Sequence, residues 1–210
     1  LILPQGEFAI SGKELTHQHW IRGNKSTVEV KSDNVQGSGE LTLALEFLLD
    51  RLQAWSSDKG ISPAVFQSVM ALKPTRPVDF DRRVQAVAHF QSLEESSALA
   101  AANKRVSNLL AKQEVLEDAV VDSALFVEPA EKALFEKLVT VEAEVEPLFA
   151  CGDYKKGLAS LAQLRQTVDA FFDDVLVVSD DEAQRTNRLA LLSRLRRGFL
   201  QAADISYLSS

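Results

Sequence analysis

The residues that could do chemistry in this chain are cations and amides spaced along segments with a helical pattern. Over residues 77–91, Arg82, Gln85 and His89 recur every three or four positions, so on a helix they share one face. The apolar residues of the segment point the other way and predict the buried face: Phe80, Val84 and Val87. Guanidinium, amide and imidazole groups can contact phosphates and unstacked base edges. The same pattern is also typical of a solvated polar face, and the spacing alone does not separate the two.

A second group follows in "AANKRVSNLL", within a helix expected from Leu93 to about Leu110. Lys104, Arg105 and Asn108 point away from its apolar stripe, and Asn103 lies near the apolar side. The connector "KPTRP" adds Arg76, and no acidic residue belongs to this set. The candidate RNA-binding residues are Arg76, Arg82, His89, Asn103, Lys104, Arg105 and Asn108.

Catalytic motifs are missing from the sequence. It contains no glycine-rich phosphate loop, no nucleophile elbow and no metal-ligand spacing of His and Cys. The acidic pairs at 173–174 and 180–181 fall at expected helix ends, where carboxylates have structural roles. Cys151 is the only cysteine and has no histidine nearby. We therefore expect no active site, no metal and no cofactor in this chain.

The most basic stretch is residues 184–200, with five arginines and no acidic residue in a chain of net charge -7. Arg188 shares a helical stripe with apolar residues, so we expect it to be buried and paired, with Asp173 or Asp174 as its partner. Arg194 and Arg197 are expected to point outward, toward RNA or solvent. Residues 114–183 hold 17 acidic and 5 basic side chains. We expect this acidic part to pack on the basic last helix, away from any RNA.

The fold class predicted from periodicity is all-α, a bundle of six to seven helices. Residues 40–210 form the expected helical domain, with helices at 40–55, from Pro63, at 77–91, 93–110, 128–149, 154–173 and 181–203. Residues 1–39 are expected to be a vector-derived leader or linker, or a small β piece of a neighbouring domain, because "STVEVKS" alternates as a strand does. There is no initiator Met, so we expect a fragment or a processed chain. The sequence contains no apolar run long enough to predict a membrane span. The single cysteine fits a reducing cytoplasm.

Long stretches of the chain resemble a known family. "RLQAW…ALKPTRPVDFDRRVQAVAHF…ALAAANKRVSNLLAK", followed by "FFDDVLVVSDDEAQRTNRLALLSRLRRGFLQAADIS", is similar to the C-terminal region of the β subunit of bacterial glycyl-tRNA synthetase. The resemblance covers roughly residues 41–208. The last part also resembles the DALR-type anticodon-binding domain of arginyl-tRNA synthetase. Residues 1–39 do not fit the resemblance to the glycyl-tRNA synthetase β subunit.

The resemblance implies a role in protein biosynthesis. The family's enzyme is a cytoplasmic α2β2 glycine–tRNA ligase in which the α subunit uses ATP and Mg, while the β subunit binds tRNA(Gly). This piece would recognise the two cytosines of the glycine anticodon and do none of the chemistry, without contact to DNA or membrane. The alternative is a helical protein-interaction module that docks another subunit. An RNA-binding domain should prefer the glycine anticodon loop and weaken steeply with salt, whereas a docking module should show no RNA preference.

Overall fold

The computed structural model describes residues 8–11, 14–21, 24–31, 51–112 and 120–209. Contacts divide the chain into two units, Leu1–Leu52 and Gln53–Ser210. The expected boundary at 39/40, and residues 40–50 of the predicted first helix, lie outside the described residues, while residues 51–58 are helical.

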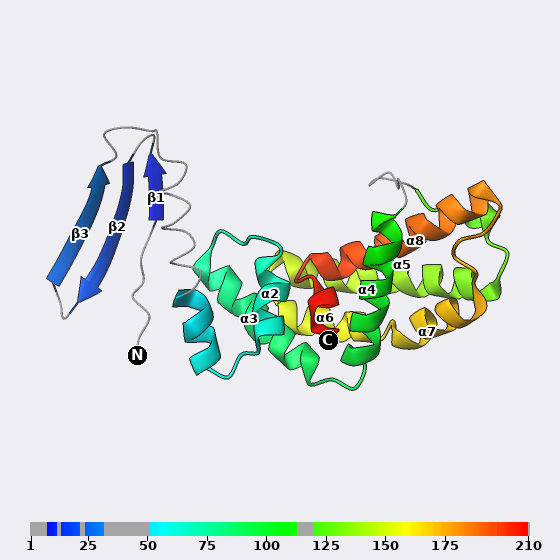
Figure 1. The fold of residues 1–210 in the computed structure, drawn as a ribbon, viewed down its shortest axis with the longest axis horizontal. Coiled ribbons are helices and arrows are strands. Elements are labelled where there is room, and N and C mark those ends of the chain that lie inside the picture. Colours follow the sequence, from blue (N-terminus) through cyan, green and yellow to red (C-terminus); the bar gives the residue numbers. More distant parts are fainter. Residues whose placement is uncertain (1–7, 12–13, 22–23, 32–50, 113–119, 210) are drawn as a thin grey trace. The chain divides into compact units, whose positions relative to one another are not determined.

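The first unit contains a three-stranded antiparallel sheet in the order β1-β2-β3. Its strands are β1 (Phe8–Ser11), β2 (Glu14–Ile21) and β3 (Asn24–Lys31), and Figure 1 shows them in dark blue. β2 pairs with β1 through Phe8↔His17 and with β3 through His17↔Val28. The strand expected around "STVEVKS" is therefore present as β3.

The second unit is a helical bundle, which confirms the predicted fold class for this part of the chain. Its helices are α2 (Pro63–Met70), α3 (Pro77–Gln91), α4 (Ser96–Ala111), α5 (Pro129–Ala150), α6 (Tyr154–Ala162), α7 (Arg165–Asp174) and α8 (Glu182–Leu200). Two short 3₁₀ helices complete it, η1 (Ser123–Leu125) and η2 (Ile205–Leu208). Within the described residues, no helix is both long enough and apolar enough to cross a membrane.

Capping residues explain where several helices begin. Ser62 accepts a hydrogen bond from the Val65 amide at 3.3 Å, and Pro63 occupies the first position of α2, as predicted. At α5, the Glu131 carboxylate accepts the Glu128 amide at 2.8 Å. Ser179 precedes α8 and is of a favourable capping type, but it does not cap this helix. Asp181 caps this helix by accepting from the Gln184 amide, while the Ser179 hydroxyl accepts from the amide of Asp181.

The single helix predicted over 154–173 is wrong, because the chain forms α6 and α7 with a tight turn between them. The amides of Gln163 and Leu164 donate to carbonyls three residues back, Ser160 and Leu161. This is 3₁₀ geometry, which turns the chain more tightly than an α-helix. Leu164 is fully buried at the turn. The apolar periodicity passes through such a turn, so it does not reveal the break.

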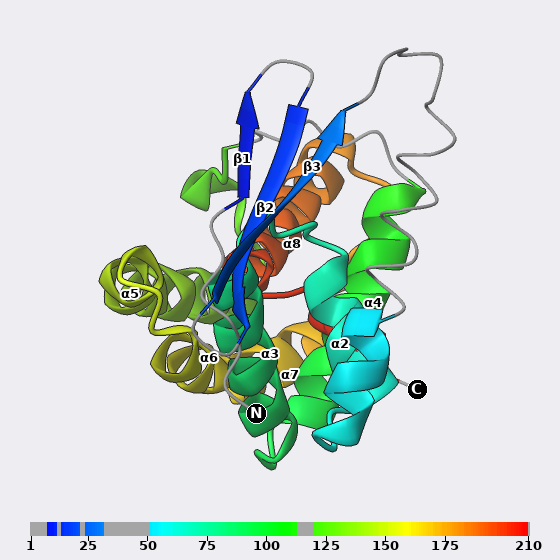
Figure 2. The same cartoon turned by 90° about the vertical axis from the view of Figure 1, so that its left-hand side faces the viewer.

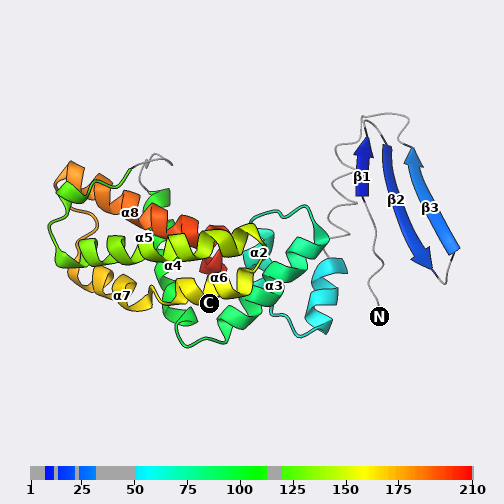
Figure 3. The same ribbon diagram turned by 180° about the vertical axis from the view of Figure 1, so that it is seen from behind.

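The core of the bundle surrounds α8. This helix contacts α4, α5 and α6, and its residues Leu191, Leu192, Leu195 and Phe199 are almost completely buried. Viewed from the side, α5 and α6 lie on one side of the bundle and α2 and α4 on the other, with α3 and α8 between (Figure 2). Seen from behind, α5 runs beside α8 along much of the length of both helices (Figure 3).

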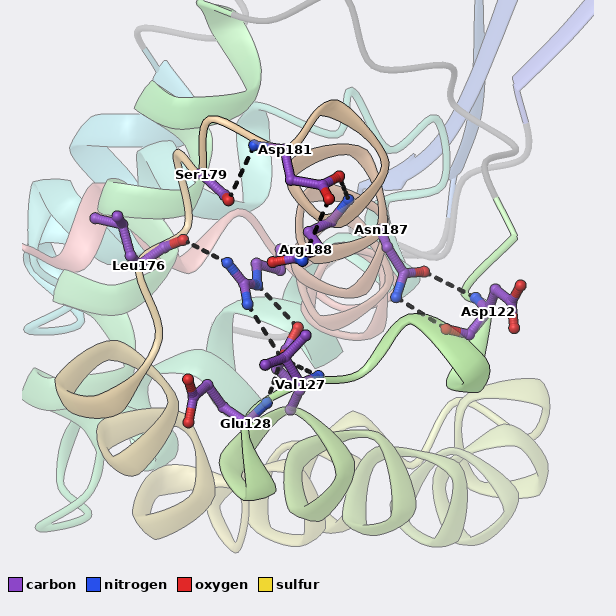
Figure 4. Close-up of polar contacts among 10 residues, drawn as sticks. Asp122, Val127, Glu128, Leu176, Ser179, Asp181, Asn187 and Arg188 are labelled. Carbon is purple, nitrogen blue, oxygen red and sulfur yellow. Dashed lines mark hydrogen bonds and ion pairs between the residues drawn. The ribbon is translucent and has the colours of Figure 1, made fainter.

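The acidic segment packs on the last helix through ion pairs. Arg194 of α8 holds Glu142 of α5 with Nε 3.0 Å from both carboxylate oxygens. Deeper in the bundle, the Arg188 Nε lies 2.9 Å from Oε1 of Glu131 (Figure 4). The burial predicted for Arg188 is confirmed, but the predicted partners are wrong, since Asp173 and Asp174 are exposed. Glu131 lies 57 positions away in the sequence, and only the fold brings it to Arg188.

Candidate nucleic-acid interface

The polar face expected on α3 is present and lines a groove. Arg82 and Gln85 are exposed and His89 is half-buried. These three side chains form one wall, and residues 151–155 of the α5–α6 turn form the other. The groove has a volume of about 750 Å³. That is enough room for an unstacked nucleotide base. We call it the α3 groove.

The turn that forms the second wall depends on one glycine. Gly152 has a positive φ of 77° and follows the C-cap of α5, a position that favours glycine. A Cβ at Gly152 would lie 3.3 Å from Nη1 of Arg82, so the turn approaches the guanidinium closely. Lys155 lies on the same wall and adds a cation that sequence spacing did not predict. Over 60 positions separate it from α3, so local periodicity could not have found it.

Two carboxylates also line the α3 groove, although the sequence-based set contained no acid. Asp153 caps α6 and pairs with Lys156 at 2.8 Å, and the hydrogen bond from Lys156 holds the pKa of Asp153 below its ordinary value. Asp81 is the other carboxylate of the lining. The groove thus presents both donors and acceptors. This balance suits the edge of a base better than it suits a phosphate, which needs donors and positive charge.

A hydrogen-bond network anchors α3 beside this groove. Tyr154 donates to Oδ1 of Asp79 at 2.6 Å, and Nε of Arg83 donates to Oδ2 at 2.7 Å. Arg83 also donates to the Tyr154 hydroxyl and to the carbonyls of Gln201 and Ala202. Burial raises the pKa of Tyr154. Burial also acts to raise the pKa of Asp79, but the hydrogen bonds from Tyr154 and Arg83 outweigh it and lower that pKa. The four-residue spacing of Asp79 and Arg83 is the sequence feature that could have predicted their ion pair.

Arg76 lies at the N-cap of α3, exposed, on a second and smaller groove. This groove is formed by the connector between α2 and α3 together with the end of α8, and we call it the connector groove. Asp79 and Arg83 line it. Their partner Tyr154 lines the α3 groove, so the network separates the two grooves.

The candidates on α4 divide into exposed and buried residues. Lys104, Arg105 and Asn108 are exposed, and the Arg105 guanidinium lies 4.3 Å from the ring centroid of Phe172 on α7. Asn103 is 1% exposed, and its side-chain amide donates to the Leu99 carbonyl at 3.0 Å. A buried amide cannot reach a base, so we assign Asn103 to the core and leave it out of the proposed surface. Lys104, Arg105 and Asn108 are not among the residues that line the α3 groove.

The arginines of residues 184–200 are mostly committed within the bundle. Arg185 donates to the Ser179 carbonyl, and Arg196 pairs with Asp204 at 2.6 Å. Arg188 and Arg194 hold Glu131 and Glu142. Arg197 is exposed, as expected, and forms none of the ion pairs found among the described residues. Two of the five arginines of this stretch therefore neutralise carboxylates of the acidic helix α5.

Metal ligation finds no support in the described part of the chain, where no three His, Cys, Asp or Glu side chains are grouped to hold an ion. The exposed Cys151 is a free thiol whose sulfur lies 3.2 Å from the Leu148 carbonyl.

The helical bundle agrees with comparisons to known proteins. The family model of the DALR anticodon binding domain matches residues 99–205, and the chain belongs to this family. The chain is 53% identical over 180 residues to the glycine–tRNA ligase beta subunits of Shewanella pealeana and Shewanella sediminis, and 52% identical to that of Shewanella halifaxensis. These matches cover 86% of this chain and confirm the predicted resemblance. The matched part is 26% of the length of each relative, so the chain spans about a quarter of these proteins.

Proposed function

We propose that this chain recognises the anticodon loop of tRNA(Gly) as one domain of a glycine–tRNA ligase β subunit. The observation that carries the proposal is that Arg82, Gln85 and His89 line the same groove, in a chain of the DALR anticodon-binding family. Anticodon bases are unstacked when a protein splays the loop, and grooves with polar walls accept such bases.

The polar groups of the α3 groove match the edge of cytosine, the base shared at two positions by glycine anticodons. Cytosine offers an amino donor at N4 and acceptors at N3 and O2. The Asp81 carboxylate and the Gln85 carbonyl can accept from N4, and Arg82 and the Gln85 amide can donate to N3 or O2. Lys104, Arg105 and Asn108 on α4 add contacts to other parts of the RNA. Because Arg105 is stacked on Phe172, its planar group is already oriented for stacking or phosphate contact.

The chemistry of glycylation belongs elsewhere in this proposal. An α subunit would supply the ATP- and Mg-dependent reaction within a cytoplasmic α2β2 assembly, and the β subunit would hold the tRNA. The proposed partners of this chain are tRNA(Gly) and the remaining parts of that enzyme, without DNA. The alternative is that the bundle docks another subunit and does not contact RNA.

The test is binding of the 210-residue chain to a labelled tRNA(Gly) anticodon stem-loop, compared with a loop whose two cytosines are replaced. We expect tighter binding to the glycine loop, and a loss of this preference in Arg82→Ala and Gln85→Ala. Lys104→Ala should weaken binding to both loops equally. Lys132→Ala, which removes an exposed cation from α5, is the control and should have no effect. Equal binding of both loops, or no binding at all, would contradict anticodon reading and favour the docking role.

A further inference from the structure

The connector groove contains two cations that the anticodon proposal does not use as a pair. We propose that Lys73 and Arg76 bind a phosphodiester group of the RNA strand whose base enters the α3 groove. This inference rests on the proposed RNA-binding function and adds a phosphate site to it. The groove is lined by Lys73, Thr75, Arg76, Asp79, Arg83 and Gln201.

The first argument is the charge available in the connector groove. Three cations and one carboxylate line it, so its formal charge is 3 - 1 = +2. Asp79 accepts hydrogen bonds from Arg83 and Tyr154, and Arg83 also donates to the carbonyls of Gln201 and Ala202. Among the ion pairs of the described residues, none involves Lys73 or Arg76. Both side chains are exposed, so a phosphate can reach the net positive charge.

The second argument is the backbone at Lys73. Its φ is +49°, in the left-handed region, and among non-glycine residues of the described chain it is alone in this conformation. A side chain with a Cβ is disfavoured there, and the following Pro74 further favours an extended residue before it. Glycine would fit this helix end better. Residues in such unfavourable backbone conformations cluster at functional sites, which supports a role for the Lys73 ammonium group.

The third argument is the stiffness of the connector. Pro74 and Pro77 flank Thr75 and Arg76, and each proline restricts its own backbone and that of the residue before it. The Thr75 hydroxyl is exposed on the same segment. Because the segment has few conformations to lose, binding an anion there costs little ordering entropy. A rigid, net positive groove suits a phosphate, whereas the mixed α3 groove suits a base.

The two grooves are adjacent along α3. Arg76 caps the helix and Arg82 follows six residues later, a rise of about 9 Å. The Asp79–Arg83–Tyr154 network lies between the grooves and fixes their relative positions. A single RNA strand can therefore cross the connector groove with its backbone and place a base in the α3 groove.

The experiment measures stem-loop binding and folding stability for Lys73→Gly in the 210-residue chain. Removing one phosphate contact should raise the Kd by roughly three- to tenfold for both the glycine loop and the cytosine-replaced loop, and should lower the slope of log K against log salt by about one. Glycine relieves the left-handed strain, so the thermal midpoint should stay equal or rise. Affinity and stability are thus expected to change in opposite directions. Lys73→Asn, which also tolerates this backbone, should behave alike, and Lys132→Ala is the control.

Each outcome decides the matter. An unchanged Kd in Lys73→Gly, with the preference of the wild-type chain for the glycine loop intact, would overturn the phosphate site and leave the anticodon proposal standing. Absence of stem-loop binding by the wild-type chain would overturn both. A lowered thermal midpoint would contradict the strain argument.

A last arm compares RNA phosphate with free phosphate. Chloride is replaced by inorganic phosphate at constant ionic strength. Free phosphate competes with the RNA for Lys73 and Arg76, so the Kd of the wild-type chain for the stem-loop should rise by a larger factor than the Kd of Lys73→Gly. Equal changes in the two Kd values would show that Lys73 does not act through a phosphate site and would overturn the inference.

Discussion

Arg188 of α8 and Glu131 of α5 form an ion pair inside the bundle, with side chains only 5% and 1% exposed. Both side chains form further hydrogen bonds. Glu131 also accepts the amides of Val127 and Glu128, and Nη1 of Arg188 donates to the Leu176 carbonyl at 2.9 Å. The pair therefore joins α8, the start of α5 and the chain after α7 (Figure 4).

Replacing this arginine should destabilise the domain. Arg188→Met leaves the Glu131 carboxylate buried without its counter-charge, and such a change costs roughly 3–5 kcal/mol. Urea unfolding followed by circular dichroism gives the free energy of unfolding. Arg197→Met is the matched control from the same helix, exposed, and should change that energy by less than about 0.5 kcal/mol. Equal effects of the two variants would show that the buried pair adds nothing specific.

Acid should destabilise the fold through carboxylates whose pKa is lowered. Burial acts to raise the pKa of Glu131 and of Asp204, but the hydrogen bonds from Arg188 and from Arg196 with Ser206 outweigh it. The unfolded chain therefore binds protons first as the pH falls. The stabilisation is complete above the ordinary carboxyl pKa near 4 and is lost as the pH falls through the lower folded values.

The thermal midpoint measured from pH 7 to pH 3 checks this expectation. Asp204→Asn should be less stable than the wild-type chain at pH 7, and should lose less stability on acidification because one titrating group is gone. An equal fall of the thermal midpoint in both proteins would mean that Asp204 does not contribute to the acid sensitivity.

Local signals in the sequence were sufficient for most helix boundaries. Ser62 with Pro63, and Pro77, start α2 and α3 where predicted, because capping and proline geometry depend only on neighbouring residues. The side of α3 that faces solvent also followed from its periodicity. By contrast, the partner of Arg188 and the second wall of the α3 groove come from segments more than 50 positions away. Periodicity contains no information about which segments meet.

The tight turn after α6 and the burial of Asn103 show a second limit. Gln163 and Leu164 keep right-handed backbone angles, so no glycine or proline marks the break. Asn103 is polar yet fully buried, because its amide is satisfied by the Leu99 carbonyl one turn earlier. Polarity alone places such a residue on the surface. The helical spacing put Asn103 near the apolar side of its helix, and the packing of α4 shows that it is buried.

Two glycines in the bundle should respond differently to alanine. A Cβ at Gly157 would lie 2.3 Å from Cε1 of Phe149, a buried ring that also packs on Tyr154. Gly157→Ala should therefore force α5 and α6 apart and cost about 1–3 kcal/mol. A Cβ at Gly198 meets Leu161 at 3.4 Å, an ordinary contact. Gly198→Ala should be neutral, or stabilising by up to about 1 kcal/mol through helix propensity. Thermal unfolding of both variants measures their relative stability. The prediction would be wrong if Gly157→Ala were as stable as Gly198→Ala.

Variants at two asparagines of α4 should separate effects on folding stability from effects on RNA binding. Asn103→Ala removes a buried hydrogen bond and should lower the free energy of unfolding by about 1 kcal/mol while the folded protein binds the stem-loop normally. Asn108→Ala removes an exposed amide and should leave stability unchanged while weakening stem-loop binding. Unfolding curves and binding isotherms for both variants test this. A binding defect confined to Asn103→Ala would return Asn103 to the interface.

The acidic helix α5 should lie away from the RNA. Glu142 forms an ion pair with Arg194, so replacing it with lysine would also place two cations together in the bundle. Glu144 is exposed and is the cleaner site. Glu144→Lys should leave the stem-loop Kd unchanged or lower it slightly through the gain of positive charge, which the same binding assay measures at low and moderate salt. Glu142→Lys should instead lower the thermal midpoint. A severe loss of affinity in Glu144→Lys would place α5 in the interface and reverse the orientation proposed for the bundle on its RNA.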